Sequence, residues 1–268
     1  MSAWLEVEDD VGRRVVLNAA PRRIVSLVPS LTELVCFLGR GDRLVGVTRY
    51  CTEPAAVVAG LPKLGGTKNP EIDRIAALQP ELVLVNAEET RREDFQSLTS
   101  AGLTILVSFP RSLHEASRSI ERVGQALDAA TAAATLAAEI ASACSEAPPP
   151  PVRVFCPIWR KPWMSFNRDT YADDLLRHAA GDNVCAGLPD RYPVIELAAV
   201  AEADPEVILL PDEPYPFADR HRGALGALSG TSAWRSGRIH LVDGKALSWY
   251  GHRTAPALRE FRRLLAGG

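Results

Sequence analysis

The alanine-rich stretch from Leu113 to Ala147 constrains the fold more than any other part of the chain. It contains no proline and one glycine, Gly124. Because alanine loses the least conformational freedom on entering a helix, this composition predicts helix along the whole stretch. Asp128 is suited to cap a second helix, so we expect a break near Leu127–Asp128 and a helix from there to Ala147. The prolines at Pro148–Pro151 cannot continue that helix.

The segments on the two sides of this helix resemble each other. Pro21–Pro29 (PRRIVSLVP) and Val152–Pro157 (VRVFCP) both contain a basic residue, an apolar run and a proline in that order. Leu78–Val85 (LQPELVLV) recurs as Ala203–Leu210 (ADPEVILL), with Pro-Glu before an apolar run. The same order of matches at similar offsets predicts a duplicated α/β unit.

Short apolar runs alternate with helical segments through the rest of the chain. Short links between them predict parallel sheets with helices on both faces. A chain of 268 residues is long enough for two cores. We therefore expect an α/β fold of two Rossmann-like lobes with parallel sheets, residues 1–128 and 148–268, joined by one long backbone helix at 129–147. The expected strands are Ile24–Val28, Leu44–Val47, Leu82–Val85, Thr104–Val107, Val152–Cys156, Val207–Leu210 and Ile239–Val242.

Turn and cap signals add local detail. Residues 5–17 alternate between apolar and polar side chains on either side of a turn, which predicts a hairpin. Ser30 or Thr32 is expected to cap the helix Leu31–Leu38, which Gly39 closes.

Charge and cysteine content exclude several classes of function. The net charge of −3 is spread over interspersed acids and bases, which predicts no nucleic-acid partner and no anionic membrane partner. No apolar run reaches the ~20 residues that span a bilayer, and the first residues lack the apolar core of a signal peptide. We expect a cytoplasmic protein as the sequence is written, and a periplasmic or cell-surface protein if a leader was trimmed. The five cysteines form no CxxC pair, which favours small buried thiols over disulfides.

Motifs of catalysis and metal binding are missing from the sequence. There is no GxSxG elbow, Walker A loop or GxGxxG turn, so we expect a protein that is not an enzyme and has no intrinsic cofactor. The five histidines show no metal-ligand spacing, and we expect no bound metal ion. His221 has two candidate roles: a metal ligand with Asp212 or Glu213, or a capping or exposed histidine, which is the more frequent role.

Aromatic residues concentrate in the second half of the chain. Of the 17 Phe, Trp and Tyr residues, 12 follow Pro151. Ligands of parallel sheets bind outside the carboxyl ends of the strands, and the loops there hold many of these rings. Any one ring could pack in the core, but the group predicts a site for a flat, partly polar ligand. The group includes Trp159, Trp163, Tyr192, Tyr215 and Trp249, with Arg253 available to bind a carboxylate or an amide.

Several motifs resemble one known family. DDVGRRVVL, PRRIVSLVPSLTELVCFLG and GGTKNPEIDRIAALQPELVLV, in this order, are similar to the helical-backbone substrate-binding proteins of cobalamin, siderophore and haem uptake, and most of all to its cobalamin-binding members. The resemblance covers nearly the whole chain. It implies two α/β lobes joined by one long helix, with the ligand in the cleft between the lobes.

The resemblance also implies site residues. Tyr50 falls where the cobalamin-binding members have a cleft tyrosine, and Tyr192 falls near a cleft tryptophan of those members. Trp249 and Arg253 match a tryptophan-to-arginine stretch at the cleft, with one residue inserted here. The chain departs from that pattern at Gly65–Gly66 and Asn86, where those members have further tryptophans, and at Ser248, where they have an aspartate. Trp159, Trp163 and Tyr215 are expected to compensate.

The family docks onto its transporter through one acidic residue in each lobe. Asp73 matches the first position, while the second aligns with Ala198, two residues from Glu196. We therefore expect a monomeric, non-catalytic binder of a cobalamin-like corrinoid or related metal chelate, with an ABC importer permease as partner. The alternatives are a binder of ferric siderophore or haem, and a cytoplasmic corrinoid-handling protein outside transport.

Overall fold

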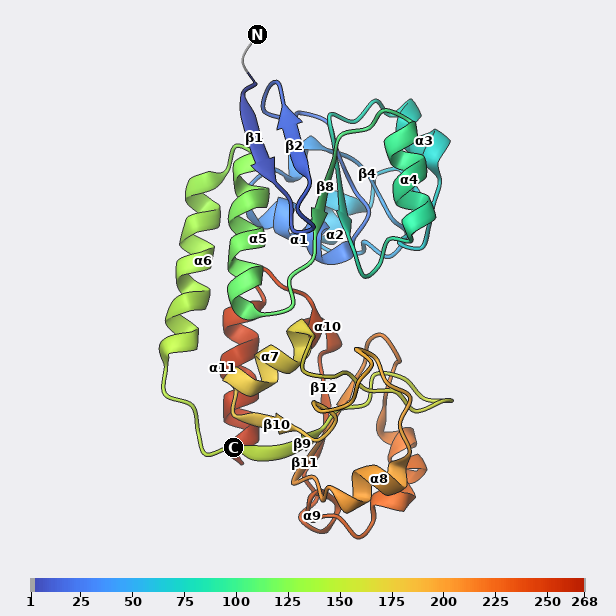
Figure 1. The fold of residues 1–268 in the computed structure, drawn as a ribbon, viewed down its shortest axis with the longest axis vertical. Helices are drawn as coiled ribbons and strands as arrows, with labels where there is room; N and C mark the ends of the chain where they lie inside the picture. Colours follow the sequence, from blue (N-terminus) through green and yellow to red (C-terminus); the bar gives the residue numbers. More distant parts are fainter. Residues whose placement is uncertain (1–2, 268) are drawn as a thin grey trace. The chain divides into compact units, whose positions relative to one another are not determined.

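The computed structural model describes residues 3–267, which form two compact units. The first, called the N-terminal lobe, contains the chain up to Pro110 together with His114–Glu139. The second, called the C-terminal lobe, contains Arg111–Leu113 and the chain from Ile140 onward. Each lobe is built on a four-stranded sheet whose strands are all parallel, which confirms the expected α/β fold (Figure 1).

The N-terminal lobe has the sheet order β4-β3-β7-β8, with a two-stranded antiparallel hairpin, β1-β2, as expected for residues 5–17. Its elements are β1 (Leu5–Glu8), β2 (Arg14–Leu17), β3 (Ile24–Ser26), α1 (Pro29–Phe37), η1 (Gly41–Arg43), β4 (Leu44–Val47), α2 (Ala55–Val58), β5 (Gly65–Gly66), β6 (Asn69–Pro70), α3 (Ile72–Ala77), β7 (Leu82–Asn86), α4 (Arg92–Ser100), β8 (Ile105–Ser108) and most of α5 (Leu113–Ala126).

Both faces of this sheet are covered. Successive side chains of a strand point to opposite faces, and β7 is buried along its whole length because helices lie on both. Val83 and Val85 pack in one core with Ile75 of α3 and Leu98 of α4. A strand buried in this way is a continuous apolar run, which is why its limits could be expected from the sequence.

The C-terminal lobe has the sheet order β10-β9-β11-β12. In Figure 1, α7 and α11 lie on one side of this sheet and α8 and α9 on the other. The elements are β9 (Val152–Phe155), α7 (Tyr171–His178), β10 (Gly181–Asn183), α8 (Leu197–Glu202), β11 (Val207–Pro211), η2 (Asp219–Leu228), α9 (Ser232–Arg235), β12 (Ile239–Val242), α10 (Gly244–Ser248) and α11 (Thr254–Leu265).

The two sheets have the same topology, which supports the predicted duplication. In each lobe the first strand in sequence lies between the second and the third, and the fourth forms the far edge. The registers agree as well: Val25 pairs with Val83 in one lobe, and Phe155 pairs with Ile208 in the other. Val25 and Phe155 are 130 positions apart in sequence, and Val83 and Ile208 are 125 positions apart. Similar offsets separate the repeated sequence motifs.

A polar clamp at the start of the sheet is repeated too. The N–H of Glu81 donates to the carbonyl oxygen of Arg23, and the N–H of Glu206 donates to that of Arg153, both at 2.8 Å. In return, Oε2 of Glu81 accepts from the N–H of Arg23 at 3.1 Å, and Oε2 of Glu206 accepts from that of Arg153 at 2.9 Å. The Pro-Glu motif therefore ties the third strand of each lobe to the first.

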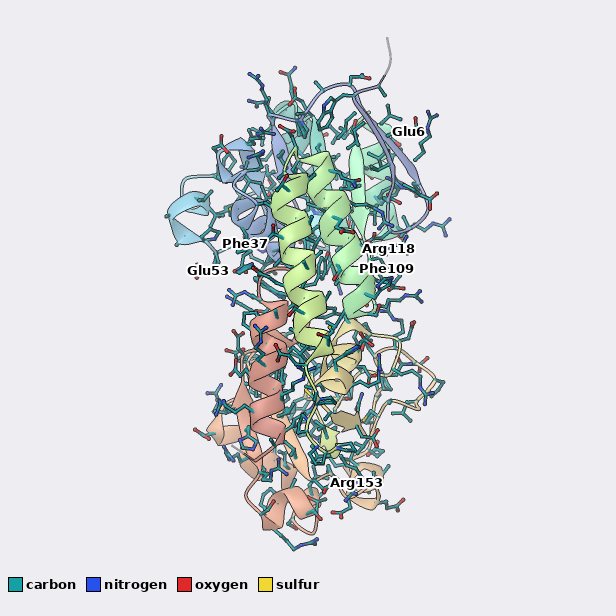
Figure 2. The ribbon with its side chains drawn as sticks, turned by 90° about the vertical axis from the view of Figure 1, so that its left-hand side faces the viewer. Glu6, Phe37, Glu53, Phe109, Arg118 and Arg153 are labelled. Atoms are coloured by element: carbon teal, nitrogen blue, oxygen red, sulfur yellow. The ribbon has the colours of Figure 1, made fainter. Side chains whose placement is uncertain are left out.

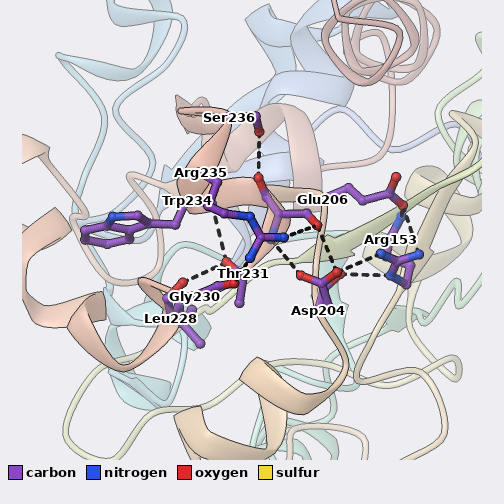
Figure 3. A network of polar contacts seen from close by, with 10 residues as sticks. Arg153, Asp204, Glu206, Leu228, Gly230, Thr231, Trp234, Arg235 and Ser236 are labelled. Carbon is purple, nitrogen blue, oxygen red and sulfur yellow. Dashed lines mark hydrogen bonds and ion pairs between the residues drawn. The ribbon is translucent and has the colours of Figure 1, made fainter.

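The clamp of the C-terminal lobe extends into a larger polar network (Figure 3). Nε of Arg153 donates to the carbonyl oxygen of Asp204 at 2.8 Å. The Asp204 carboxylate accepts from the N–H of Ser232 at 2.6 Å and from its hydroxyl at 2.8 Å, so it holds the start of α9. These hydrogen bonds from Ser232 hold the pKa of Asp204 below its ordinary value.

The long helical stretch is broken where the sequence predicts, but not by the predicted cap. α5 ends at Ala126, and α6 (Ala130–Ser145) begins in the N-terminal lobe and ends in the C-terminal lobe. Asp128 does not cap α6, which starts two residues later. It has φ +57 instead, a left-handed conformation that aspartate tolerates in the turn between helices.

Small residues let α5 and α6 run side by side (Figure 2). A Cβ atom on Gly124 would lie 2.2 Å from the Cβ of Ala133, so only glycine fits at this crossing. The other helix residues buried along α6 follow a helical spacing, because only one face is covered. They are Leu136, Ala137, Ile140 and Ala143. Within residues 3–267, no helix has both the length and the apolar character to cross a bilayer.

Other local expectations need correction. α1 begins at Pro29, and neither Ser30 nor Thr32 is its N-cap. Proline is well suited to the first helical position, since its missing N–H has no helical partner there. Thr32 instead donates to the Ser26 hydroxyl or to the Val28 carbonyl oxygen, at 2.9 and 3.0 Å. All five cysteines are free thiols, but Cys36 and Cys144 are only partly buried.

Candidate functional site

Two loops at the carboxyl ends of β9 and β11 bring aromatic rings together. Trp159 and Tyr215 make an edge-to-face contact with ring centroids 5.6 Å apart. Tyr215 lies 4.7 Å from Phe217, and Phe217 is parallel to Trp163 at 6.0 Å. Together with His221, 5.3 Å from Tyr215, these residues are called the aromatic cluster below. Three residues that the sequence singled out, Trp159, Trp163 and Tyr215, therefore lie in one place.

The aromatic cluster extends from the hydrophobic core to the surface. Phe217 is buried, and Trp163 and Tyr215 are partly buried against the core of the lobe. Trp159 is the outermost ring, 42% exposed. The buried rings fix the orientation of the outer one, so the cluster offers an apolar face at little entropic cost.

A small hairpin holds Trp159 and Trp163. The N–H of Ile158 donates to the carbonyl oxygen of Met164 at 2.9 Å, and the N–H of Met164 donates to that of Trp159 at 3.1 Å. Met164 also forms a β-bridge with Val194, from the loop after β10. The tip of the hairpin carries Arg160 and Lys161.

His221 is a capping histidine, the more frequent of its two expected roles. The N–H of Ala218, just before η2, donates to Nδ1 of His221 at 3.0 Å. Nδ1 is therefore unprotonated and the proton of the neutral ring is on Nε2, which lies 3.4 Å from the Tyr215 hydroxyl. Burial, followed by the charges of Arg220 and Arg160, lowers the pKa of His221.

The two carboxylates that the sequence suggested as metal-ligand partners of His221 accept hydrogen bonds from other residues. Oδ1 of Asp212 accepts from the N–H of Gly244 at 2.8 Å, and Oε1 of Glu213 accepts from the indole N–H of Trp249 at 3.2 Å. A Cβ on Gly244 would lie 2.4 Å from the Glu213 carbonyl oxygen, so the loops after β11 and β12 are closely packed. Burial raises the pKa of Glu213, against the opposing effect of Lys245.

The side chains of Trp249 and Arg253, both candidate site residues, lie close together. The Arg253 guanidinium lies 5.8 Å from the Trp249 ring centroid, and Nζ of Lys245 lies 5.1 Å from it. Cations at this distance from an indole are attracted to the negative face of the ring. Arg253 also lies 3.7 Å from the Asp243 carboxylate.

The remaining predicted ligand contacts are exposed rings beside arginines. Tyr192, on the loop after β10, is 41% exposed, with the Arg191 guanidinium 5.8 Å from its centroid. Tyr50, after β4 in the N-terminal lobe, is 53% exposed, with the Arg49 guanidinium at 5.1 Å.

The departures from the resembled family have local reasons. A Cβ on Gly66 would lie 2.5 Å from Oδ1 of Asn69 and 3.1 Å from a ring carbon of Tyr50, so no side chain fits there. Asn86 is nearly buried, and its Oδ1 accepts from the N–H of Glu88 at 2.8 Å. These positions shape turns, and the N-terminal lobe has fewer rings at its strand ends as a result.

The predicted docking acids occupy different positions in the repeat. Asp73 is exposed in the first turn of α3, where Ala198 is its counterpart in α8. Glu196 is exposed at the N-cap of α8, and its counterpart is Glu71, the N-cap of α3. Glu71 pairs with Arg74, whereas Asp73 has no ion pair among the described residues.

Sequence reasoning missed some members of the site. Lys245 and Glu213 were not recognised as the groups that flank and hold Trp249, and Phe217 was not recognised as the ring that supports Trp163. Their only signal was a position on the same strand-end loops. Among residues 3–267, no group of three or more His, Cys, Asp or Glu side chains is arranged to hold a metal ion.

Comparisons with known proteins define the class of this protein. The sequence profile of the periplasmic binding protein family matches residues 24–243, so the chain belongs to that family. It is a ligand-binding protein of this family.

Individual relatives are consistent with this class. The chain is 26% identical over 201 residues to a vitamin B12-binding protein of Photorhabdus laumondii, covering 72% of each chain. It is 35% identical over 123 residues to YvrC, an ABC transporter substrate-binding lipoprotein of Bacillus subtilis, but this covers only 45% of the chain and 38% of the lipoprotein.

Solved structures share the fold. The vitamin B12-binding protein of Vibrio cholerae superimposes with a TM-score of 0.80 at 22% identity, over 92% of this chain and 97% of that one. The apo form of the heme-binding protein RhuT from Roseiflexus sp. RS-1 has a TM-score of 0.78 at 27% identity, over 92% and 98%.

Proposed function

We propose that this protein is a non-catalytic carrier that binds a cobalamin-like corrinoid or a related metal chelate for ABC-type uptake. The aromatic cluster is the observation that carries the proposal. It lies at the carboxyl ends of β9 and β11, where parallel sheets bind ligands, and its outermost ring is open to solvent. The names of the relatives support the same class of ligand.

The polar groups of the site support a binding role over a catalytic one. His221 uses Nδ1 to cap η2, and Glu213 accepts the indole N–H of Trp249. Both groups therefore position other residues, and neither is placed to act as a general base on a nucleophile. A stable complex with unaltered ligand is the expected outcome of mixing protein and chelate.

A titration tests the proposed function. Purified full-length protein is titrated with cyanocobalamin, a ferric siderophore and iron(III) protoporphyrin IX while tryptophan fluorescence is followed. We expect saturable quenching by at least one chelate, because Trp159 and Trp249 lie at the strand ends. Absence of quenching by all three, with no heat detected by calorimetry, contradicts the proposal.

Haem is the second candidate ligand. The similarity to the heme-binding protein of Roseiflexus favours it, since the identity of 27% is higher than that to the vitamin B12-binding protein of Vibrio cholerae. Tyr215, with the His221 ring N–H near its hydroxyl, also offers a polar contact suited to a ligand with acceptor groups.

A permease is the proposed partner, with Asp73 and Glu196 as docking acids. The test replaces both with lysine and measures uptake in cells that express the cognate importer. We expect transport to fall while ligand affinity in solution is unchanged, since both acids are exposed. Glu202→Lys, a charge change at the other end of α8, is the matched control. Unchanged transport in the double variant contradicts this docking surface.

This transport role requires action outside the cytoplasmic membrane, and a corrinoid-handling role inside the cell is the alternative. Fractionation of cells that produce the native gene product decides between them. Recovery with the periplasmic or surface fraction supports uptake, and recovery with the cytosol supports the alternative.

A further inference from the structure

The start of α1 has hydrogen-bond donors without acceptors. The first N–H groups of a helix have no partner inside the helix and must find one elsewhere. Val28, the N-cap of α1, makes no side-chain cap, and Pro29 has no N–H. Within residues 3–267, neither the N–H of Ser30 nor that of Leu31 has a hydrogen-bond acceptor. The first bonded N–H is that of Thr32, which donates to the Val28 carbonyl oxygen at 3.0 Å.

These donors are buried, which makes their lack of partners unusual. Leu31 is 0% exposed and Ser30 is 6% exposed. About nine-tenths or more of the buried backbone N–H groups in proteins are hydrogen-bonded, because an unpaired one loses its bond to water without replacement. The first turn of α1 also has no acidic side chain that could take up these groups. An acceptor from outside the chain is the remaining way to satisfy them.

The hydroxyl of Ser30 is a third donor at the same place. In the part of the chain that the structure describes, this nearly buried side chain has no hydrogen-bond partner. The Cα–Cβ bonds of a helix tilt toward its N-terminus, so a side chain at the second helical position is directed to the end with the free N–H groups. Two backbone amides and one hydroxyl are therefore available at the carboxyl end of β3.

Buried hydroxyls hold this turn in place. The Thr32 hydroxyl lies 2.9 Å from the Ser26 hydroxyl oxygen and 3.1 Å from Sγ of Cys51. The Ser26 hydroxyl donates to the Val28 carbonyl oxygen at 3.1 Å. These contacts join α1 to the end of β3 and to the loop after β4. Because the turn is already ordered, a ligand that binds there pays little for ordering it.

The equivalent strand end of the C-terminal lobe is built differently. There β9 is followed by Pro157 and by the hairpin that holds Trp159 and Trp163, and no helix begins before α7. In the N-terminal lobe, Pro29 begins α1 three residues after the last residue of β3. The same framework thus presents rings at one strand end and N–H donors at the other.

We propose that the N-terminus of α1, with the Ser30 hydroxyl, binds a phosphate group carried by the transported ligand. The free N–H groups and the positive end of the helix dipole both favour an anion. Three donors match the several acceptor oxygens of a phosphate better than the two oxygens of a carboxylate. The inference rests on the proposed function and adds a subsite to it: the ligand is a chelate with a phosphate on a side arm.

Corrinoids that differ in one side arm test the inference. Dicyanocobinamide ends this arm in a hydroxyl, cobinamide phosphate ends it in a phosphate, and cobyric acid has a carboxylate in its place. Each is titrated in its dicyano form into the full-length protein at constant ionic strength, and tryptophan quenching is followed. We expect cobinamide phosphate to bind at least about tenfold more tightly than dicyanocobinamide, since hydrogen bonds to a charged group contribute that factor or more.

Three variants make the test specific. Ser30→Asp puts a carboxylate beside the free N–H groups, and we expect it to abolish the preference for the phosphate. Ser30→Ala removes one donor, so the preference should fall while the unfolding midpoint is unchanged, because the hydroxyl has no partner to lose. Ser26→Ala is the matched control: it removes a hydroxyl that is already hydrogen-bonded, and should lower the unfolding midpoint but retain the preference.

Amide NMR signals give a second measurement that does not depend on a corrinoid. Inorganic phosphate is titrated into the full-length protein against chloride at equal ionic strength. We expect the amide signals of Ser30 and Leu31 to shift in the wild type and to stay in place in Ser30→Asp.

The outcomes separate this inference from the proposed function. Equal affinity for dicyanocobinamide and its phosphate, equal affinity for cobyric acid and the phosphate, or a preference retained in Ser30→Asp overturns the inference and leaves the carrier role standing. If no corrinoid binds, the corrinoid function fails. Shifts of the two amide signals by inorganic phosphate then still support the phosphate site, and their absence overturns it.

Discussion

The two lobes share a framework and differ in what they carry at its carboxyl end. Both have the same strand order, and both tie the first and third strands with an Arg-Glu clamp at the other end of the sheet. At the carboxyl ends, the N-terminal lobe has Tyr50 and tight turns at Gly66 and Asn86, whereas the C-terminal lobe has the aromatic cluster.

The comparison separates residues that maintain the fold from residues that are free to change. The clamp pairs backbone groups that would otherwise lose partners, so its loss destabilises either lobe. Strand-end loops bear no such constraint because they lie outside the ladder of hydrogen bonds. After duplication, the strand-end loops of one lobe can therefore gain aromatic and basic side chains while those of the other lobe remain short turns.

The largest effect is expected in the sheet cores. Phe155 and Val25 occupy equivalent central positions, and both are fully buried. Phe155→Ala should cost about 3–5 kcal/mol of unfolding free energy, and Val25→Ala about 2 kcal/mol, because the smaller side chain leaves the smaller cavity. Denaturant unfolding of both variants measures this. Equal losses of unfolding free energy in the two variants would contradict this expectation, because the loss would then not depend on the size of the side chain removed.

The next effect concerns binding and rests on the proposed ligand class. Trp249→Ala and Arg253→Ala should each weaken chelate binding by about tenfold, without unfolding the protein, because each removes a contact at the strand ends. Tyr50→Ala, the matched change in the N-terminal lobe, should weaken chelate binding less, since no aromatic ring packs against Tyr50 within residues 3–267. The titration described above measures all three. A larger loss of chelate affinity for Tyr50→Ala than for the other two variants would show that the N-terminal lobe contributes more to binding than the C-terminal lobe.

The clamp should contribute equally in both lobes. Glu81→Ala and Glu206→Ala are each expected to cost about 1 kcal/mol, a modest amount because the side chains are partly exposed. Chemical denaturation of the two single variants and the double variant tests this. We expect additive losses, since the clamps belong to separate cores. A loss confined to one lobe would indicate that only that clamp supports its sheet.

The smallest effect is a pH dependence confined to the C-terminal lobe. The pKa of His221 is lowered on folding, so the unfolded chain binds its proton more readily than the folded chain does. Stability from the neutral ring is therefore full above its ordinary pKa of 6.5 and decreases as the pH falls below that value. Unfolding midpoints between about pH 7 and pH 5 should change less in His221→Asn, whose amide oxygen can still accept the Ala218 N–H. An identical pH profile of unfolding midpoints in the variant would show that His221 does not cause this pH dependence.

Some of this protein follows from its sequence alone. Leu44–Val47 and Ile239–Val242 are strands with the predicted limits, because a continuous apolar run between turn residues has few alternatives. The break near Asp128, the hairpin at residues 5–17 and the repeat were predictable for the same local reasons. The sequence also placed Trp159, Trp163 and Tyr215 on strand-end loops.

Other features were decided by tertiary structure. β10 (Gly181–Asn183) has a sequence with poor strand propensity and is a strand only because β9 supplies its hydrogen-bond partners. Asp128 forms a turn and Pro29 begins α1, although local rules favoured other caps. The pairing of Trp163 with Phe217 joins two positions 54 residues apart in sequence, and no local pattern encodes such a contact.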